Sequence, residues 1–171
     1  AKAAVDEGAA TGVGAGIAIQ VVDNSTRAEL LGNLSGGDDL AISATGSHDT
    51  RTTASGGASS KDGTAVGGSF AITVADNRTQ AVVDGGSALN LTGDFSASAQ
   101  HHGHTTTLAE GDAAGGTAVG AAIALSFVDD VAHASLARSL TAGGAVALDA
   151  HGDGTSVAEA TASVAGASSE Q

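Results

Sequence analysis

Pairs of side chains that carry oxygen ligands recur through the chain at intervals of 53 residues. They are Asp23-Asn24, Asp76-Asn77 and Asp129-Asp130. Carboxylate and amide oxygens are the ligands that Ca²⁺ prefers, and stacking the copies would bring these oxygens together. The same residue types also favour turns, where they would cap the end of a strand and form a ladder of asparagines. We favour the turn and the ladder and predict no cofactor-binding or metal-binding residues, with Ca²⁺ as the alternative.

A run of histidines, His101-His102-Gly103-His104, is the second group with the chemistry to bind a metal, in this case a transition metal. The matching regions of the other copies hold only His48 and His151. Because the run is not repeated, we interpret it as an exposed polar loop.

Two further surface motifs are weaker. Thr50–Thr52 and Thr105–Thr107 suggest flat threonine ladders of the kind that ice-binding solenoids use, but the third copy does not keep their register. The N-glycosylation pattern also occurs, although turn chemistry explains these asparagines more simply; the four positions are Asn24, Asn33, Asn77 and Asn90.

No constellation in the sequence predicts catalysis. Adjacent carboxylates occur at Asp38-Asp39 and Asp129-Asp130, but neighbours in a strand point to opposite faces. A glycosidase needs two carboxyl groups that face each other across the substrate. Trp and Tyr are absent, so neither can stack on a sugar ring. We predict that the chain is not an enzyme and has no catalytic residues.

The Asp-Asn pairs close a repeated block that the fold must position. Thr11–Asn24 returns as Thr64–Asn77 and as Thr117–Asp130, and the bulky residues keep one parity in all three copies. A period of two predicts a half-buried strand. The opposite face is rich in Gly, Ala, Ser and Thr, and would either meet water or lie close against another sheet. We expect the bulky residues to line the core as columns: Ile17/Phe70/Ile123, Ile19/Ile72/Leu125 and Val21/Val74/Phe127.

A second repeated block aligns without a gap as Leu34–Ala44, Leu89–Ala99 and Leu140–Ala150, and its Gly-rich centre predicts a turn. Each unit therefore reads as about four strands separated by Gly, Asp and Asn turns.

These patterns predict an all-β fold, a parallel β-solenoid (β-helix) built from three 53-residue repeats. We expect residues 1–171 to form a single solenoid segment whose repeat blocks start near residues 11, 64 and 117. Residues 1–10 resemble the tail of a preceding repeat. Each repeat forms either one wide rung or two narrow ones, and two is the slightly favoured prediction.

The net charge of −13 comes from 19 acidic and only six basic residues, too few basic groups for a phosphate-binding surface. The acidic residues are spread through all three units, which indicates a solvated acidic surface. No apolar run reaches the length that predicts a membrane span. We therefore expect neither a nucleic-acid partner nor a membrane span.

The string AVGxxxAIxVxDNxTxA, followed by a Gly-rich turn and an alternating strand such as DLAISA, resembles the repeats of giant bacterial surface proteins. These are the filamentous-haemagglutinin-like and related β-strand-repeat adhesins. The resemblance covers essentially the whole chain and implies a secreted, elongated stalk or filament without a cofactor or active site. The third unit departs from it, because Asp130-Val131-Ala132 stands where the others have Asn-x-Thr.

We therefore predict a non-catalytic structural repeat module of an extracellular bacterial adhesin or surface filament. Its expected partners are neighbouring repeats of the same chain, with end-to-end self-association as a further expectation. Two alternatives stay open: a ligand-binding or Ca²⁺-binding surface module, and a self-assembling fibre subunit.

Overall fold

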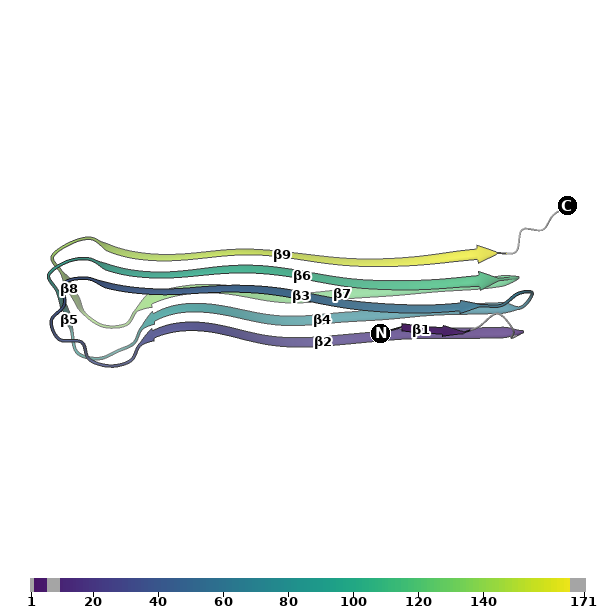
Figure 1. The fold of residues 1–171 in the computed structure, drawn as a ribbon, viewed down its shortest axis with the longest axis horizontal. Helices are drawn as coiled ribbons and strands as arrows, with labels where there is room; N and C mark the ends of the chain where they lie inside the picture. The colour runs from purple at the N-terminus through teal and green to yellow at the C-terminus, as the bar shows by residue number, and fades with distance from the viewer. Residues whose placement is uncertain (1, 6–9, 167–171) are drawn as a thin grey trace.

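A computed structural model describes residues 2–5 and 10–166, and the described residues form β-strands joined by turns (Figure 1). Among them are a four-stranded sheet in the order β1-β3-β6-β9 (sheet A), a three-stranded sheet in the order β2-β4-β7 (sheet B) and the pair β5-β8. All the strand pairings are parallel, which confirms the predicted all-β parallel solenoid. The strand bounds are β1 Lys2–Val5, β2 Thr11–Leu30, β3 Leu40–Ser59, β4 Thr64–Val83, β5 Leu89–Leu91, β6 Phe95–Gly115, β7 Thr117–Leu136, β8 Leu140–Ala142 and β9 Val146–Gly166.

The repeats stack in the register that the sequence alignment predicts. In sheet B, Thr11 pairs with Thr64, and Thr64 pairs with Thr117. In sheet A, Phe95 pairs with Leu40 on one side and with Val146 on the other. Like residues therefore form columns that run across the strands, one residue from each repeat.

Each 53-residue repeat makes one wide rung, so the preference for two narrow rungs was wrong. A rung consists of one strand of sheet A and one of sheet B, each 20 or 21 residues long, or about 66 Å at 3.3 Å per residue. The strands of the two sheets run in opposite directions, and β5 and β8 lie in the turns at one end (Figure 1). The Asp-Asn pairs were predicted to end a strand, and this was wrong: they lie within β2 and β4, and the Asp129-Asp130 pair lies within β7. The inward side chains of the stacked copies form hydrogen bonds to one another there.

The expected tail of a preceding repeat, residues 1–10, is described in part. Strand β1 pairs in parallel with Ser55–Ala58 of β3, on the edge of sheet A away from β6. Residues 1 and 6–9 of this tail lie outside the described part of the chain.

The prediction of which strand face is buried was wrong. In the central strand β4, Ala71 is fully buried and Gly67 is buried, whereas Phe70 and Ile72 are only half-buried. Val74, the third bulky residue of the central rung, is exposed. The predicted columns of bulky residues exist, but they cover the outer face of sheet B instead of lining the core. The small-residue face lies inside, packed against sheet A.

Close approach of the two backbones explains why the inner face is small. A Cβ atom added to Gly67 would lie 1.8 Å from the backbone oxygen of Asp112, across the gap in β6. An added Cβ at Gly56 of β3 would lie 1.7 Å from the oxygen of Gly68 in β4. Over this half of the rung there is no room for valine or isoleucine between the sheets, so Ala and Gly fill the space.

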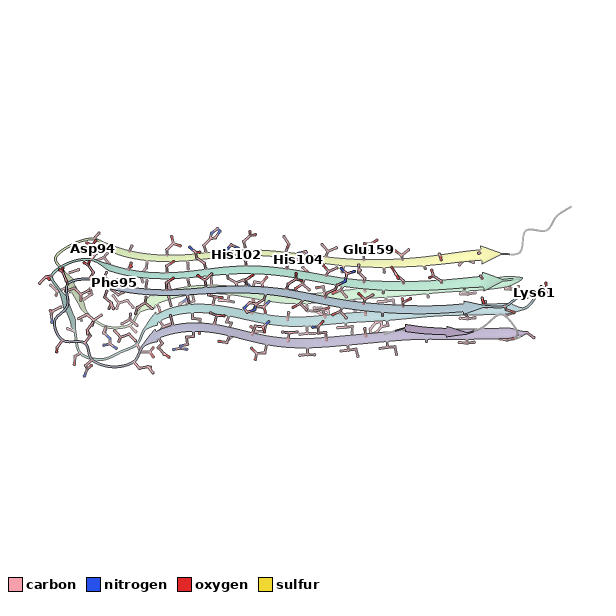
Figure 2. All side chains as sticks on the ribbon, in the orientation of Figure 1. Lys61, Asp94, Phe95, His102, His104 and Glu159 are labelled. Carbon is pink, nitrogen blue, oxygen red and sulfur yellow. The ribbon has the colours of Figure 1, made fainter. Side chains whose placement is uncertain are left out.

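The gap is wider at the end that carries β5 and β8. There Leu89 and Phe95 are almost completely buried, and Figure 2 shows Phe95 at this end of the molecule. They belong to one apolar cluster made of Ala44, Ala81, Val83, Leu89, Leu91, Phe95, Ala97 and Ala99. The large apolar side chains of the core are therefore gathered at one end, and the rest of the interior contains alanine, glycine and polar residues.

Candidate functional site

The recurring Asp-Asn pairs divide between the two faces of sheet B, because neighbours along a strand point in opposite directions. The Asn member points inward and forms a ladder. Nδ2 of Asn24 donates to Oδ1 of Asn77 at 2.8 Å, and Nδ2 of Asn77 donates to Oδ1 of Asp130 at 2.8 Å. The predicted asparagine ladder is thus present, whereas its predicted place in a turn was wrong.

This geometry is unfavourable for a Ca²⁺ site made from the adjacent pairs. Asp76 lies on the outer face and is joined to Arg78 by two hydrogen bonds of 2.9 Å. That bonding, and then the charge of Asp76, raises the pKa of the Arg78 guanidinium, so the guanidinium stays protonated. Asn77 is oriented into the core and uses its amide in the ladder. Among the described residues, no group of three or more His, Asp or Glu side chains is placed to hold a metal ion.

The histidine run lies within β6, so its interpretation as an exposed loop was wrong. His101 points inward and is completely buried. Its Nδ1 lies 3.0 Å from Oγ1 of Thr79, its Nε2 lies 3.2 Å from Oδ1 of Asp130, and its ring centroid lies 5.4 Å from that of His48. It therefore extends the asparagine ladder into a polar cluster between the sheets.

The other two histidines of the run point out of sheet A, where Figure 2 labels them. Nδ1 of His104 bonds to Oγ1 of Thr155 at 2.9 Å, and Nδ1 of His102 lies 4.0 Å from Oδ2 of Asp153. The alternation of the strand separates them from His101, so the three rings do not converge on one point.

The threonine segments lie mainly in the interior, so they do not form the flat outer ladder that ice-binding solenoids use. Oγ1 of Thr73 donates to Oγ1 of Thr52 at 2.7 Å and lies 2.7 Å from Oγ1 of Thr107. Oγ1 of Thr52 in turn donates to Oε1 of Gln20. These hydroxyls link the two sheets across the gap. Of the glycosylation-pattern asparagines, Asn77 is buried, whereas Asn33 and Asn90 are exposed.

We expect Asn77→Ala to lower the free energy of unfolding by about 2 kcal/mol, because it leaves Nδ2 of Asn24 unpaired and deprives Asp130 of a donor. Urea titration followed by circular dichroism measures this loss. The matched control is Asp76→Ala, one residue away on the outer face, where an exposed ion pair contributes at most about 1 kcal/mol. Equal losses in both variants would contradict a structural role for the ladder.

Arg138 is a buried residue that the sequence did not single out. It lies in the turn between β7 and β8 and donates to four backbone carbonyls of the other two rungs, three in their turns and one at the last residue of β2. The Nη1 bond to the oxygen of Gly32 measures 2.8 Å, and the other acceptors are the oxygens of Leu30, Asp84 and Gly85. One guanidinium therefore ties together the turns of all three rungs at the wide end of the solenoid.

Replacing Arg138 by methionine keeps an apolar stem but removes all the donors, so four carbonyls lose a hydrogen bond. The oxygen of Leu30 still accepts from the backbone N–H of Asp84. We expect a loss of about 2–4 kcal/mol in the free energy of unfolding, since bonds to charged donors contribute about 1.5–3 kcal/mol each before the cost of burying the charge. Urea titration again provides the measurement. Arg51→Met, at an exposed position in β3, should change stability by less than about 0.5 kcal/mol. A similarly small effect at Arg138 would show that its hydrogen bonds to the carbonyls of the other rungs do not stabilise the fold.

The outer faces of the two sheets differ in chemistry. Sheet A presents polar and charged side chains along β6, such as Gln100, Glu110 and Asp112. Sheet B presents an apolar surface between its first residues and the Asp23/Asp76/Asp129 column, which we call the apolar face. Ten large residues of this face are exposed by 36–74%: Val13, Ile17, Ile19, Val21, Val66, Val74, Val119, Ile123, Leu125 and Phe127.

Comparisons with known proteins add no family assignment: no protein-family model matches the chain, and no curated protein or solved structure gives a match. Within the described residues, no helix is long and apolar enough to cross a membrane.

Proposed function

We propose that the chain is a structural repeat module of an extracellular bacterial adhesin or surface filament, without catalytic activity. The observation that supports this proposal best is the stacking of 53-residue units in register. Each unit repeats the backbone pairing of the one before it. A further unit would therefore extend the array through the same type of backbone pairing.

The proposed role is mechanical. Ladder hydrogen bonds between rungs run along the stacking axis, and the two sheets share any load applied along it. Two sets of side-chain hydrogen bonds follow the same direction, because each connects different rungs. They are the ladder from Asn24 through Asn77 to Asp130 and the bonds from the Arg138 guanidinium to backbone carbonyls. These contacts hold successive rungs together, as a stalk that transmits force would need.

A test of the proposed location uses antibodies raised against this chain. We expect them to label intact cells of the source organism, and we expect protease treatment of intact cells to remove the signal. Labelling that appears only after permeabilisation would contradict a surface role. Antibodies against a cytoplasmic protein of the same cells serve as the control for leakage.

End-to-end assembly into fibres is a second candidate, and the terminal strand β9 supports it. Val146, Leu148 and Val164 continue the inward-facing columns of β6, yet they are 48–55% exposed because no described rung covers them. Another rung, from the same chain or from another copy, would bury them. Light scattering should then grow with concentration without reaching a limit, and Leu148→Lys should suppress the growth.

A further inference from the structure

We propose that the apolar face of sheet B binds the same face of a second copy, so that two solenoids associate side by side. This inference does not depend on the proposed surface role, because it concerns only the outer chemistry of the described rungs. It also differs from end-to-end stacking, which uses the inner face of β9.

The size of the apolar face is the first argument. Its ten large side chains are about half exposed on average. Complete burial of such a side chain stabilises by about 2.5 kcal/mol, which at about 25 cal/mol per Å² corresponds to about 100 Å² of apolar area. The face therefore presents about 500 Å² of contiguous apolar surface, near the upper end of what monomeric proteins expose. Two such faces would bury about 1,000 Å² together, which is where specific interfaces begin.

The arrangement of the columns is the second argument, because it is self-complementary. Consider two copies related by a two-fold axis parallel to the stacking direction and placed at the Ile17/Phe70/Ile123 column. Strands of the two copies then run antiparallel, and that central column faces its own counterpart. Positions equally distant from it on either side face each other. The Val13/Val66/Val119 column meets the Val21/Val74/Phe127 column, and the small Ala15/Gly68/Ala121 column meets the large Ile19/Ile72/Leu125 column.

Charge supports the same orientation. In the antiparallel arrangement, the Asp23/Asp76/Asp129 column lies opposite Thr11, Thr64 and Thr117, whose hydroxyls are suitable donors to carboxylates. The other face-to-face two-fold arrangement has parallel strands. It would place the three aspartates of one copy against the three of the other, and such like-charge contacts are unfavourable. Since the net charge is −13 and the apolar face carries no charge, added salt should strengthen the association.

Sedimentation velocity tests the association itself. We expect the chain to shift from monomer to dimer between about 1 and 100 μM, a range set by an interface at the lower size limit, and the shift to occur at lower concentration in high salt. Ile123→Lys, in the self-facing column, should weaken dimerisation at least tenfold because it places two lysines opposite each other. The matched control is Val157→Lys on the outer face of sheet A, where the original residue is similarly exposed, and it should leave dimerisation unchanged. A monomer throughout the range, or equal weakening by both variants, would overturn the proposal.

Cross-linking tests the geometry, and the chain suits it because it contains no cysteine. Facing sheets lie about 10 Å apart, which is too far for a disulfide, so a short bis-maleimide linker is the appropriate probe. We expect the single variant Ile123→Cys to cross-link with itself and Val66→Cys to remain uncoupled. A mixture of Val66→Cys and Val74→Cys chains should form the mixed dimer. Self-linking of Val66→Cys without self-linking of Ile123→Cys would indicate parallel strands and overturn the proposed arrangement.

Discussion

Gly67→Ala is expected to cause one of the largest losses of stability that a single methyl group can produce in this chain. The new Cβ would lie 1.8 Å from the oxygen of Asp112 and 2.7 Å from its carbonyl carbon, both of which are backbone atoms. No side chain can move aside to relieve this contact, so the strands must separate. The same column is tight in the first rung, where a Cβ at Gly14 would lie 1.9 Å from the oxygen of Gly57. A local shift would therefore disturb the neighbouring rung.

We expect a loss of about 3 kcal/mol or more for Gly67→Ala, the upper range for overpacking a close-packed interior. For a chain of this size the loss corresponds to a fall in Tm of roughly 6–12 °C. Thermal unfolding followed by circular dichroism measures this change, provided that the sample is dilute enough to remain monomeric.

Gly68→Ala is the matched control, since it makes the same substitution one residue further along the same strand. A Cβ at Gly68 would meet nothing within 4 Å, and its column neighbours are already alanines, Ala15 and Ala121. We expect stability to stay the same or to rise by about 0.5 kcal/mol, because alanine restricts the unfolded chain more than glycine does. If both variants lost stability equally, the loss could not come from the contact at Gly67, and the close approach of the sheets there would be refuted.

The repeat spacing and the period of two were enough to predict an all-β fold, its parallel stacking and its register. They did not predict the strand lengths: about four strands per unit were expected, whereas each rung has two strands of 20 or 21 residues, and β5 and β8 in the turns are only three residues long. Gapless alignment at 53 residues pairs Thr11 with Thr64, and the structure has that pairing. The period shows that the two faces of a strand differ, but it does not show which face is buried. Large residues are usually inside, so the sequence favoured a core of Phe70 and Ile72.

The width of the gap decides which face is buried, and the turns set this width. At one end, β6 and β7 are separated by a single residue, Gly116, which keeps the sheets close together. At the other end, residues 84–94 and 137–145 contain β5 and β8 and hold the sheets further apart. The interior is therefore wedge-shaped, with large side chains at one end and backbone contact at the other. The repeat pattern records that the turns differ in length, but it carries no measure of the distance between the sheets.

The polar interior was predictable only in part. An asparagine ladder follows from stacking identical residues, and the sequence did suggest it. The burial of His101 follows from the same alternation that buries Thr105 and Thr107, but only once β6 is known to continue through the histidine run. Arg138 offered no such signal, because its acceptors lie 53–108 residues away in other rungs.

Phe95→Ala should produce a loss comparable to that of Gly67→Ala, but by leaving a cavity. Phe95 is 1% exposed in the central rung, so the rungs above and below prevent the wide end from collapsing onto the space left behind. Its neighbours in the cluster include Leu89 and Leu91. Truncation of a buried phenylalanine costs about 3–5 kcal/mol, and we expect Tm to fall by about 6–20 °C.

Phe127→Ala makes the same substitution on the apolar face, where Phe127 is 58% exposed. In dilute solution, where the chain is monomeric, we expect this variant to lose less than about 1 kcal/mol, because most of the ring already meets water. At concentrations that permit dimerisation the same variant should lose apparent stability, since mass action then links folding to association. A large loss for Phe127→Ala in dilute solution, with a small one for Phe95→Ala, would mean that the bulky columns line the interior after all. The proposed lateral contact would then have no surface to use.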